Sequence, residues 1–130
     1  MTLITRAVNG YIEGRLGLPQ IVNDMFIDDT SEGIVSRHDP STARETDYID
    51  GSAEGVLNIA YWARYKDAAA CRRTLDMLID CVDGVELEDG GGSTMRVTAV
   101  TLPQYVETDD KNMTTYTASI RVEYERNNEV

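Results

Sequence analysis

The sequence predicts a single α+β domain in which two helices pack on a mainly antiparallel sheet. Two stretches, residues 2–16 and 68–82, repeat apolar residues at helical spacing. A third, residues 114–125, alternates apolar and polar residues with a period of two, which is typical of a strand with one face in water. The elements follow the order helix, strands, helix, strands, and 130 residues is the length of one domain, spanning 1–130.

The first helix is expected over residues 2–16. Thr2 is placed to cap its start, and Gly17, followed by Pro19, stops it. The next segment, residues 20–33, contains several large apolar side chains before an acidic pair, so we expect it to be partly buried.

Two short extended segments are expected next. The first is the strand Gly33–His38, which the turn residues Asp39-Pro40-Ser41 would end. The second covers Thr46–Ile49. Asp50-Gly51-Ser52 is then expected to form a tight, exposed turn, because glycine tolerates the positive φ that such turns require.

The long strand that follows, Val56–Tyr65, carries apolar residues on both faces, so we expect it to be central or to meet another subunit. Its expected core face is Leu57, Ile59, Tyr61, Ala63 and Tyr65. The aromatic residues Tyr61, Trp62 and Tyr65 are interpreted as core or as part of a subunit interface.

The second helix is expected to begin after the capping residue Asp67 and to end at Gly84. Its expected buried stripe is Ala68, Cys71, Leu75, Leu78, Ile79 and Val82. Cys71 and Cys81 lie roughly 15 Å apart along this helix, too far for a disulfide, so both are expected to be free thiols.

The last part of the chain begins with the acidic, glycine-rich segment Glu86–Ser93, expected to be a connection. A strand over residues 94–102, broken by Pro103, and a strand over Thr114–Glu125 follow. Residues 126–130 are expected to fray.

The net charge of −11 is concentrated in two connecting regions. Residues 28–58 carry eight acids against Arg37 and Arg44, and residues 83–113 carry seven against Arg96 and Lys111. Tight binding of nucleic acid is disfavoured, because neutralising phosphate needs clustered Lys and Arg. These acidic residues either lie in solvated loops that keep the protein soluble or form a surface that repels a polyanion.

No residue pattern points to catalysis. The run Gly90-Gly91-Gly92-Ser93-Thr94 lacks the lysine of a phosphate-binding loop. Ser36, His38 and Asp39 are neighbours along an extended segment, where alternate side chains do not converge into a triad. One histidine and two distant cysteines are too few for a zinc site. We therefore expect no enzyme activity, cofactor or metal.

Carboxylates at Asp47, Asp50 and Glu54 could hold calcium or magnesium, but their spacing does not match the ligand spacing of a calcium-binding loop. No apolar run is long enough to cross a bilayer, and the first residues do not have the pattern of a secretion signal. We therefore expect a protein of the cytoplasm with no membrane partner.

With these features in order, the chain resembles the minor capsid or tail-terminator (tail-completion) proteins of long-tailed bacteriophages and their prophages. The resemblance rests on the N-terminal helix, the segment GIVSRHDP, the block YIDGSAEGVLNIAYWARYKD leading into a helix, and the late pair VTLPQYV and YTASIRVEYE. It covers nearly the whole chain and is strongest over residues 48–66. The acidic stretch Glu86–Asp89 has no counterpart in the family pattern.

The resemblance implies a structural virion protein. Such proteins form hexameric rings at the head-proximal end of the tail tube, end tube polymerisation and offer a surface for head docking. The implied partners are further copies of the chain, the major tail tube protein and head–tail connector proteins. The implied location is the head–tail junction of the virion, reached from the host cytoplasm during assembly.

DNA would pass through such a ring without specific binding, and a negative lining would repel its phosphates. The candidate lumen- or interface-facing acids are Asp47, Asp50, Glu54, Glu86, Glu88 and Asp89. Two other functions stay open at this point. One is an acidic DNA mimic that inhibits a host nuclease, and the other is a small α+β ligand-binding module or enzyme that uses a carboxylate pair.

Overall fold

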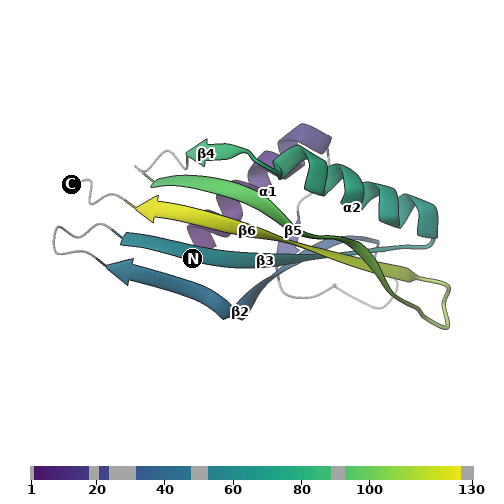
Figure 1. Ribbon diagram of the computed structural model, residues 1–130. Coiled ribbons are helices and arrows are strands. Elements are labelled where there is room, and N and C mark those ends of the chain that lie inside the picture. The colour runs from purple at the N-terminus through teal and green to yellow at the C-terminus, as the bar shows by residue number, and fades with distance from the viewer. Residues whose placement is uncertain (1, 18–20, 24–31, 48–52, 89–92, 127–130) are drawn as a thin grey trace.

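A computed structural model describes residues 2–17, 21–23, 32–47, 53–88 and 93–126 of the chain (Figure 1). These residues form two helices and six strands. In chain order they are α1 Thr2–Leu16, β1 Val22–Asn23, β2 Gly33–Asp47, β3 Ala53–Tyr65, α2 Ala68–Val82, β4 Glu86–Glu88, β5 Ser93–Thr108 and β6 Thr114–Arg126.

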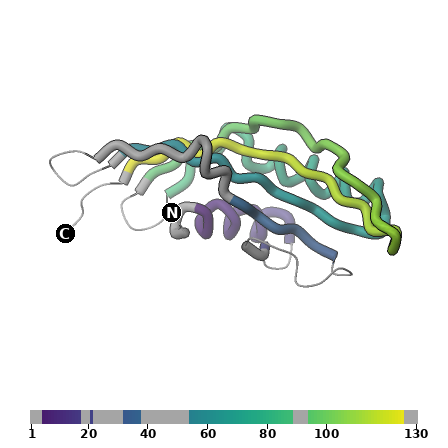
Figure 2. The backbone as a smooth tube through the Cα atoms, turned by 90° about the horizontal axis from the view of Figure 1, so that it is seen from below, coloured from purple at the N-terminus to yellow at the C-terminus, as the bar shows by residue number. Residues whose placement is uncertain are grey.

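The strands form one sheet in the order β1-β2-β3-β6-β5-β4. All neighbours are antiparallel except β1 and β2, which are parallel over two residue pairs. The sheet curls along its length, as Figure 2 shows from below, and both helices contribute to the core on one face. The predicted α+β class, with two helices on a mainly antiparallel sheet, is confirmed.

The core lies between this face of the sheet and the helices. β3 is a central strand, paired with β2 on one side and β6 on the other, as its two-sided apolar pattern indicated. Its buried side chains are Leu57, Ile59, Tyr61 and Ala63, while Tyr65 is half-buried. From β6 the core receives Ala118, Ile120, Val122 and Tyr124, the face predicted by period-two alternation.

The helix boundaries agree with the sequence signals. Asp67 caps α2, because its Oδ1 accepts hydrogen bonds from the amides of Ala69 and Ala70 at 3.0 and 3.3 Å. Gly17 and Gly84 follow the two helices with φ of +66° and +79°, a region that favours glycine. The buried stripe of α2 is also as predicted, except that Ala68 is exposed because it lies in the first turn, before the helix reaches the sheet.

Two predicted strand breaks are wrong, and both involve proline. β2 runs without interruption from Gly33 to Asp47, through the expected turn, with a register shift against β3 between Asp39 and Arg44. β5 continues through Pro103 to Thr108. Among the described residues, each strand pairs on one side only along these stretches, so the proline, which has no N–H, interrupts no second set of backbone hydrogen bonds, and bulges absorb the irregularity.

A third correction concerns Glu86–Ser93, expected to be only a connection. Its first three residues form β4, which pairs antiparallel with β5 through Glu86–Arg96, Leu87–Met95 and Glu88–Thr94. The half-buried Leu87 packs against the core. The expected turn at Asp50-Gly51-Ser52 lies outside the described residues. Of residues 126–130, which were expected to fray, Arg126 is the last residue of β6 and the others lie outside the described residues.

A buried polar network joins α1 to the sheet. The Tyr61 hydroxyl donates to Asn9 Oδ1 at 2.7 Å, and Asn9 Nδ2 donates to Ser36 Oγ at 3.1 Å. All three residues are buried, and burial raises the pKa of the Tyr61 phenol far above its ordinary value. Because each polar group needs its partner in the dry interior, the network sets the position of α1 on the sheet.

Candidate functional site

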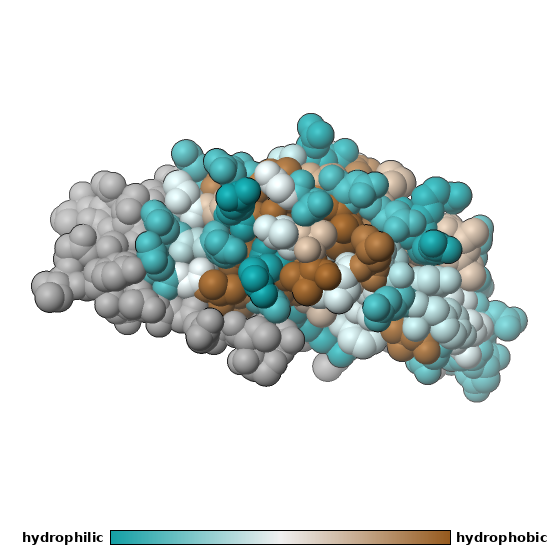
Figure 3. All heavy atoms as spheres, viewed as in Figure 1, coloured by the Kyte–Doolittle hydropathy of each residue, from teal (hydrophilic) through white to brown (hydrophobic). Residues whose placement is uncertain are grey.

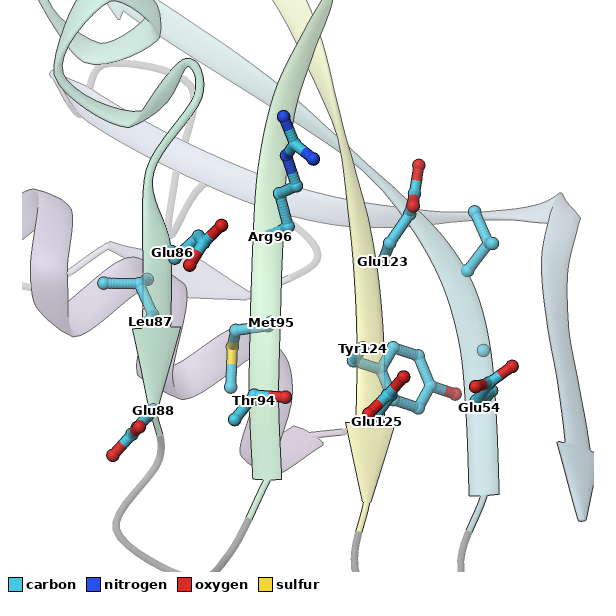
Figure 4. Close-up of a pocket in the computed structure, with 12 residues that line it drawn as sticks. Glu54, Glu86, Leu87, Glu88, Thr94, Met95, Arg96, Glu123, Tyr124 and Glu125 are labelled. Carbon is cyan, nitrogen blue, oxygen red and sulfur yellow. The ribbon is translucent and has the colours of Figure 1, made fainter. Parts of the chain in front are cut away.

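A hollow lies at the end of the sheet where β3 and β5 begin and β6 ends. Its volume is about 960 Å³. Side chains from β3, β4, β5 and β6 line it (Figure 4). Five of them are exposed glutamates: Glu54, Glu86, Glu88, Glu123 and Glu125. We call this site the acidic hollow.

Strand register explains why these glutamates gather. Glu86 pairs with Arg96 and Arg96 with Glu123, so these three residues form one row across β4, β5 and β6. The next row is Glu88, Thr94, Glu125 and Glu54. Paired residues share a face of the sheet, and this is the face opposite the helices, because the alternate residues Met95, Val122 and Tyr124 are in the core.

The two rows differ in charge balance. In the first, Arg96 lies between Glu86 and Glu123 in the strand register, and Figure 4 shows the Glu86 and Arg96 side chains on adjacent strands. In the second, Glu54 and Glu125 are directly opposite each other on β3 and β6. Directly opposed like charges on a sheet destabilise it. Five glutamates against one arginine leave the hollow with a formal charge of −4 (−5 + 1).

Three of the six acids predicted as lumen- or interface-facing are therefore brought together: Glu54, Glu86 and Glu88. They come from the two acidic regions of the sequence, which the fold joins at one end of the sheet. Asp47 is the last residue of β2, but its side chain lies outside the described part of the structure. Asp50 and Asp89 lie outside the described residues altogether.

Sequence reasoning missed Glu123, Glu125 and Arg96 as members of this site. The sequence did contain a signal for the two glutamates. The period-two alternation of β6 places both Glu123 and Glu125 on the face away from the core. Their meeting with β4 could not be found, because β4 itself was not predicted.

The predicted aromatic residues do not form one cluster. Tyr61 is in the core, while Trp62 lies on the opposite face of β3 with the Arg37 guanidinium 5.2 Å from its ring centroid. Tyr65 is half-buried near α2, and burial raises the pKa of its phenol. Tyr61 is thus core, as one of the two interpretations held, and Trp62 makes a cation–π contact.

The remaining reactive groups are part of the packing. Cys71 and Cys81 are both free, as predicted, and burial raises the pKa of each thiol. The Cys71 thiol donates to backbone carbonyls of Ala63 and Thr114 at 3.1 and 3.4 Å. Within the described residues, no three His, Cys, Asp or Glu side chains are arranged to hold a metal ion.

No protein-family model and no curated protein sequence matches the chain. Neither of the described helices has the length and apolar character needed to span a membrane.

Proposed function

We propose that this chain is a structural protein of a long-tailed phage particle, a tail terminator that forms a ring at the head-proximal end of the tail tube. There it ends tube polymerisation and offers the surface to which the head docks. The observation that supports this proposal best is the acidic hollow, where two acidic regions of the sequence meet on the helix-free face of the sheet.

The physical link is electrostatic. DNA leaving the head passes through the ring, and its phosphates bind surfaces on which Lys and Arg are clustered. In the proposed ring each copy presents its acidic hollow to the lumen, where a formal charge of −4 repels phosphate and keeps the DNA moving. The partners are further copies of the chain, the major tail tube protein and head–tail connector proteins, and no catalysis or cofactor is involved.

Electron microscopy of particles labelled with an antibody against this protein tests the location. We expect label at the head–tail junction and six-fold rings on tails detached from heads. Label confined to the distal tail tip or to the capsid shell would contradict the proposal.

A pair of charge-reversed variants tests the role of the acidic hollow. Glu123→Lys with Glu125→Lys changes the net charge from −11 to −7 (two reversals of +2 each). Glu107→Lys with Asp110→Lys makes the same change at exposed acids outside the hollow. We expect only the first pair to slow DNA release from particles, with the delay shrinking as salt rises. Equal delays from both pairs would show that the position of the acids does not matter.

The acidic hollow also fits a second function, a DNA mimic that inhibits a host nuclease. That function predicts tight, salt-sensitive binding to a basic host protein, which a pull-down from host lysate at low and high salt would detect. Capture of such a nuclease through Glu123 and Glu125, without label at the head–tail junction, would favour the mimic over the terminator.

A further inference from the structure

The second half of β5 carries most of the exposed large apolar side chains of the described structure. Val100, Leu102, Tyr105 and Val106 are 47, 72, 58 and 40% exposed, and the only other such residue among those described is Met77 on α2. Single exposed apolar residues are ordinary, but here four lie within seven positions of one strand. We call residues 100–106 the β5 strip; Figure 3 shows apolar surface atoms over the sheet where β5 runs in Figure 1.

The β5 strip lies at an open edge of the sheet. Near its start, β5 is covered by β4, by backbone hydrogen bonds of Val97 with Gly84 and Val85, and by Asp83 Oδ1, which accepts from the Ala99 amide at 2.9 Å. Beyond Ala99, β6 is the one strand that pairs with β5 among the described residues. The exposed side chains therefore begin where the covering of the edge ends.

The irregular register of β5 explains their exposure. Its pairing with β6 shifts three times, between Ala99 and Thr101, between Thr101 and Gln104, and between Tyr105 and Glu107. Val100, Leu102 and Val106 lie within these three shifts. Bulges of this kind, together with Pro103, which has no N–H, make the edge a poor template for adding a regular strand. A partner at this edge would therefore contact its side chains and would not extend the sheet by backbone pairing.

The charge pattern indicates what the partner is. The run Val97–Val106 has no charged residue, and its residues Ala99–Tyr105 pair with Tyr116–Ile120, which also has none, in a chain of net charge −11. A second copy carries the same net charge, so an uncharged surface is where two copies approach with the least repulsion. A basic partner would instead be drawn to the acidic hollow, where the carboxylates of the same sheet lie.

We propose that the β5 strip is the contact surface for a second copy of this chain, with the Leu102 side chain at its centre. The proposal rests on the proposed function only for the number of copies, since a ring joins each subunit to the next through a head-to-tail contact between unlike surfaces. The self-association itself follows from the apolar strip, the open edge and the absence of charge.

Sedimentation of the full chain tests the proposal, at about 10 and about 500 µM protein and about 0.5 M salt, where screening lengths are a few Å. We expect reversible self-association that Leu102→Asp and Val106→Asp each weaken about tenfold or more, because a carboxylate there must be desolvated in the contact. Met77→Asp is the matched control, since Met77 is as exposed as Val100 and lies on α2. We expect that control to leave the dissociation constant within about twofold of the wild type.

Hydrogen exchange gives a second readout that does not depend on substitution. Amides of Gln104 to Glu107 should exchange more slowly at the higher concentration in the wild type and not in Leu102→Asp. A wild type that stays monomeric at both concentrations, or a Met77→Asp variant that weakens association as much as Leu102→Asp, would overturn the proposal. Concentration-independent protection of the β5 strip would do so too, because the strip would then be covered by its own chain.

The outcomes also separate this proposal from the proposed function. Rings at the head–tail junction that still assemble from Leu102→Asp protein would overturn the β5 contact and leave the terminator in place. If the protein self-associates through the β5 strip but antibody label never appears at the head–tail junction, the β5 contact would stand and the terminator function would be overturned.

Discussion

The two ends of the sheet differ in both charge and edge protection. At the end where β3 begins, β4 covers the edge of β5, and five glutamates line the acidic hollow. Toward the end where β3 finishes, the edge of β5 is open and the paired runs Ala99–Tyr105 and Tyr116–Ile120 have no charge. The same two strands, β5 and β6, build both ends.

This difference shows how a strongly acidic chain can still offer a surface for association. In the proposed ring, separating charge from apolar surface along one pair of strands would let one end repel polyanions while the other contacts a copy of equal net charge. It also predicts that the same type of residue has different roles at the two ends.

The two tyrosines at the ends of the β5–β6 pair should differ most. Tyr124 is 3% exposed and belongs to the core, so Tyr124→Ala should cost about 3–5 kcal/mol of unfolding free energy. Tyr105 is 58% exposed, and its ring packs edge-to-face on Tyr116 with the two ring centroids 5.7 Å apart. Tyr105→Ala should therefore lower the unfolding free energy by less than about 1.5 kcal/mol. Urea unfolding at low protein concentration measures both. Similar losses would show that the two ends do not differ in packing.

In the middle of the sheet, Tyr61→Phe should cost about 1–3 kcal/mol, because Asn9 Oδ1 loses its donor in a buried site. The folded-state pKa of Tyr61 is raised above its unfolded value near 10.0, so its contribution is complete below pH 10 and is lost as pH rises further. Unfolding followed against pH should therefore show a shallower alkaline loss in Tyr61→Phe. An identical alkaline slope would mean that another group controls the loss.

Asp83 marks the point where the edge of β5 passes from covered to open. Asp83→Ala removes the acceptor of the exposed Ala99 amide and should cost about 0.5–1.5 kcal/mol. Exchange of the Ala99 amide should accelerate, while Asp80→Ala, an exposed change on the same helix, should leave it unaltered. Equal acceleration in both variants would indicate a general loosening of α2.

The smallest effect is expected in the acidic hollow. Glu125→Gln removes one of the two carboxylates that face each other across β3 and β6, so it should stabilise the fold by about 0.2–1 kcal/mol. The gain should be larger at low salt, because screening weakens the repulsion. Thermal unfolding at two salt concentrations measures it. A loss of stability would show that Glu125 has a favourable partner.

The sequence was sufficient for the elements whose signals are local. Both helices, the cap at Asp67 and the alternation of β6 follow from spacing within one segment, and each lies where it was predicted. The acids Glu54, Glu86 and Glu88 could be singled out by charge density, although their meeting place depends on strand order.

The elements that could not be predicted depend on neighbours far along the chain. Pro40 and Pro103 normally end strands, and only the position of β2 and β5 along unpaired edges makes them tolerable. β4 is three residues long, and pairing with Thr94 to Arg96 defines it, which no periodicity reveals. The roles of Glu123 and Glu125 in the acidic hollow follow from that pairing and were missed with it.

The place of β6 in the sheet has a consequence for synthesis on the ribosome. β6 is the last described strand in the chain, yet it lies between β3 and β5 and pairs with both over most of its length. Until residues 114–126 have been translated, β3 and β5 each lack this partner and the core face of the sheet is incomplete. Nascent chains therefore expose apolar surface and unpaired edges until a late stage, which makes this protein a natural client for chaperones that act during translation.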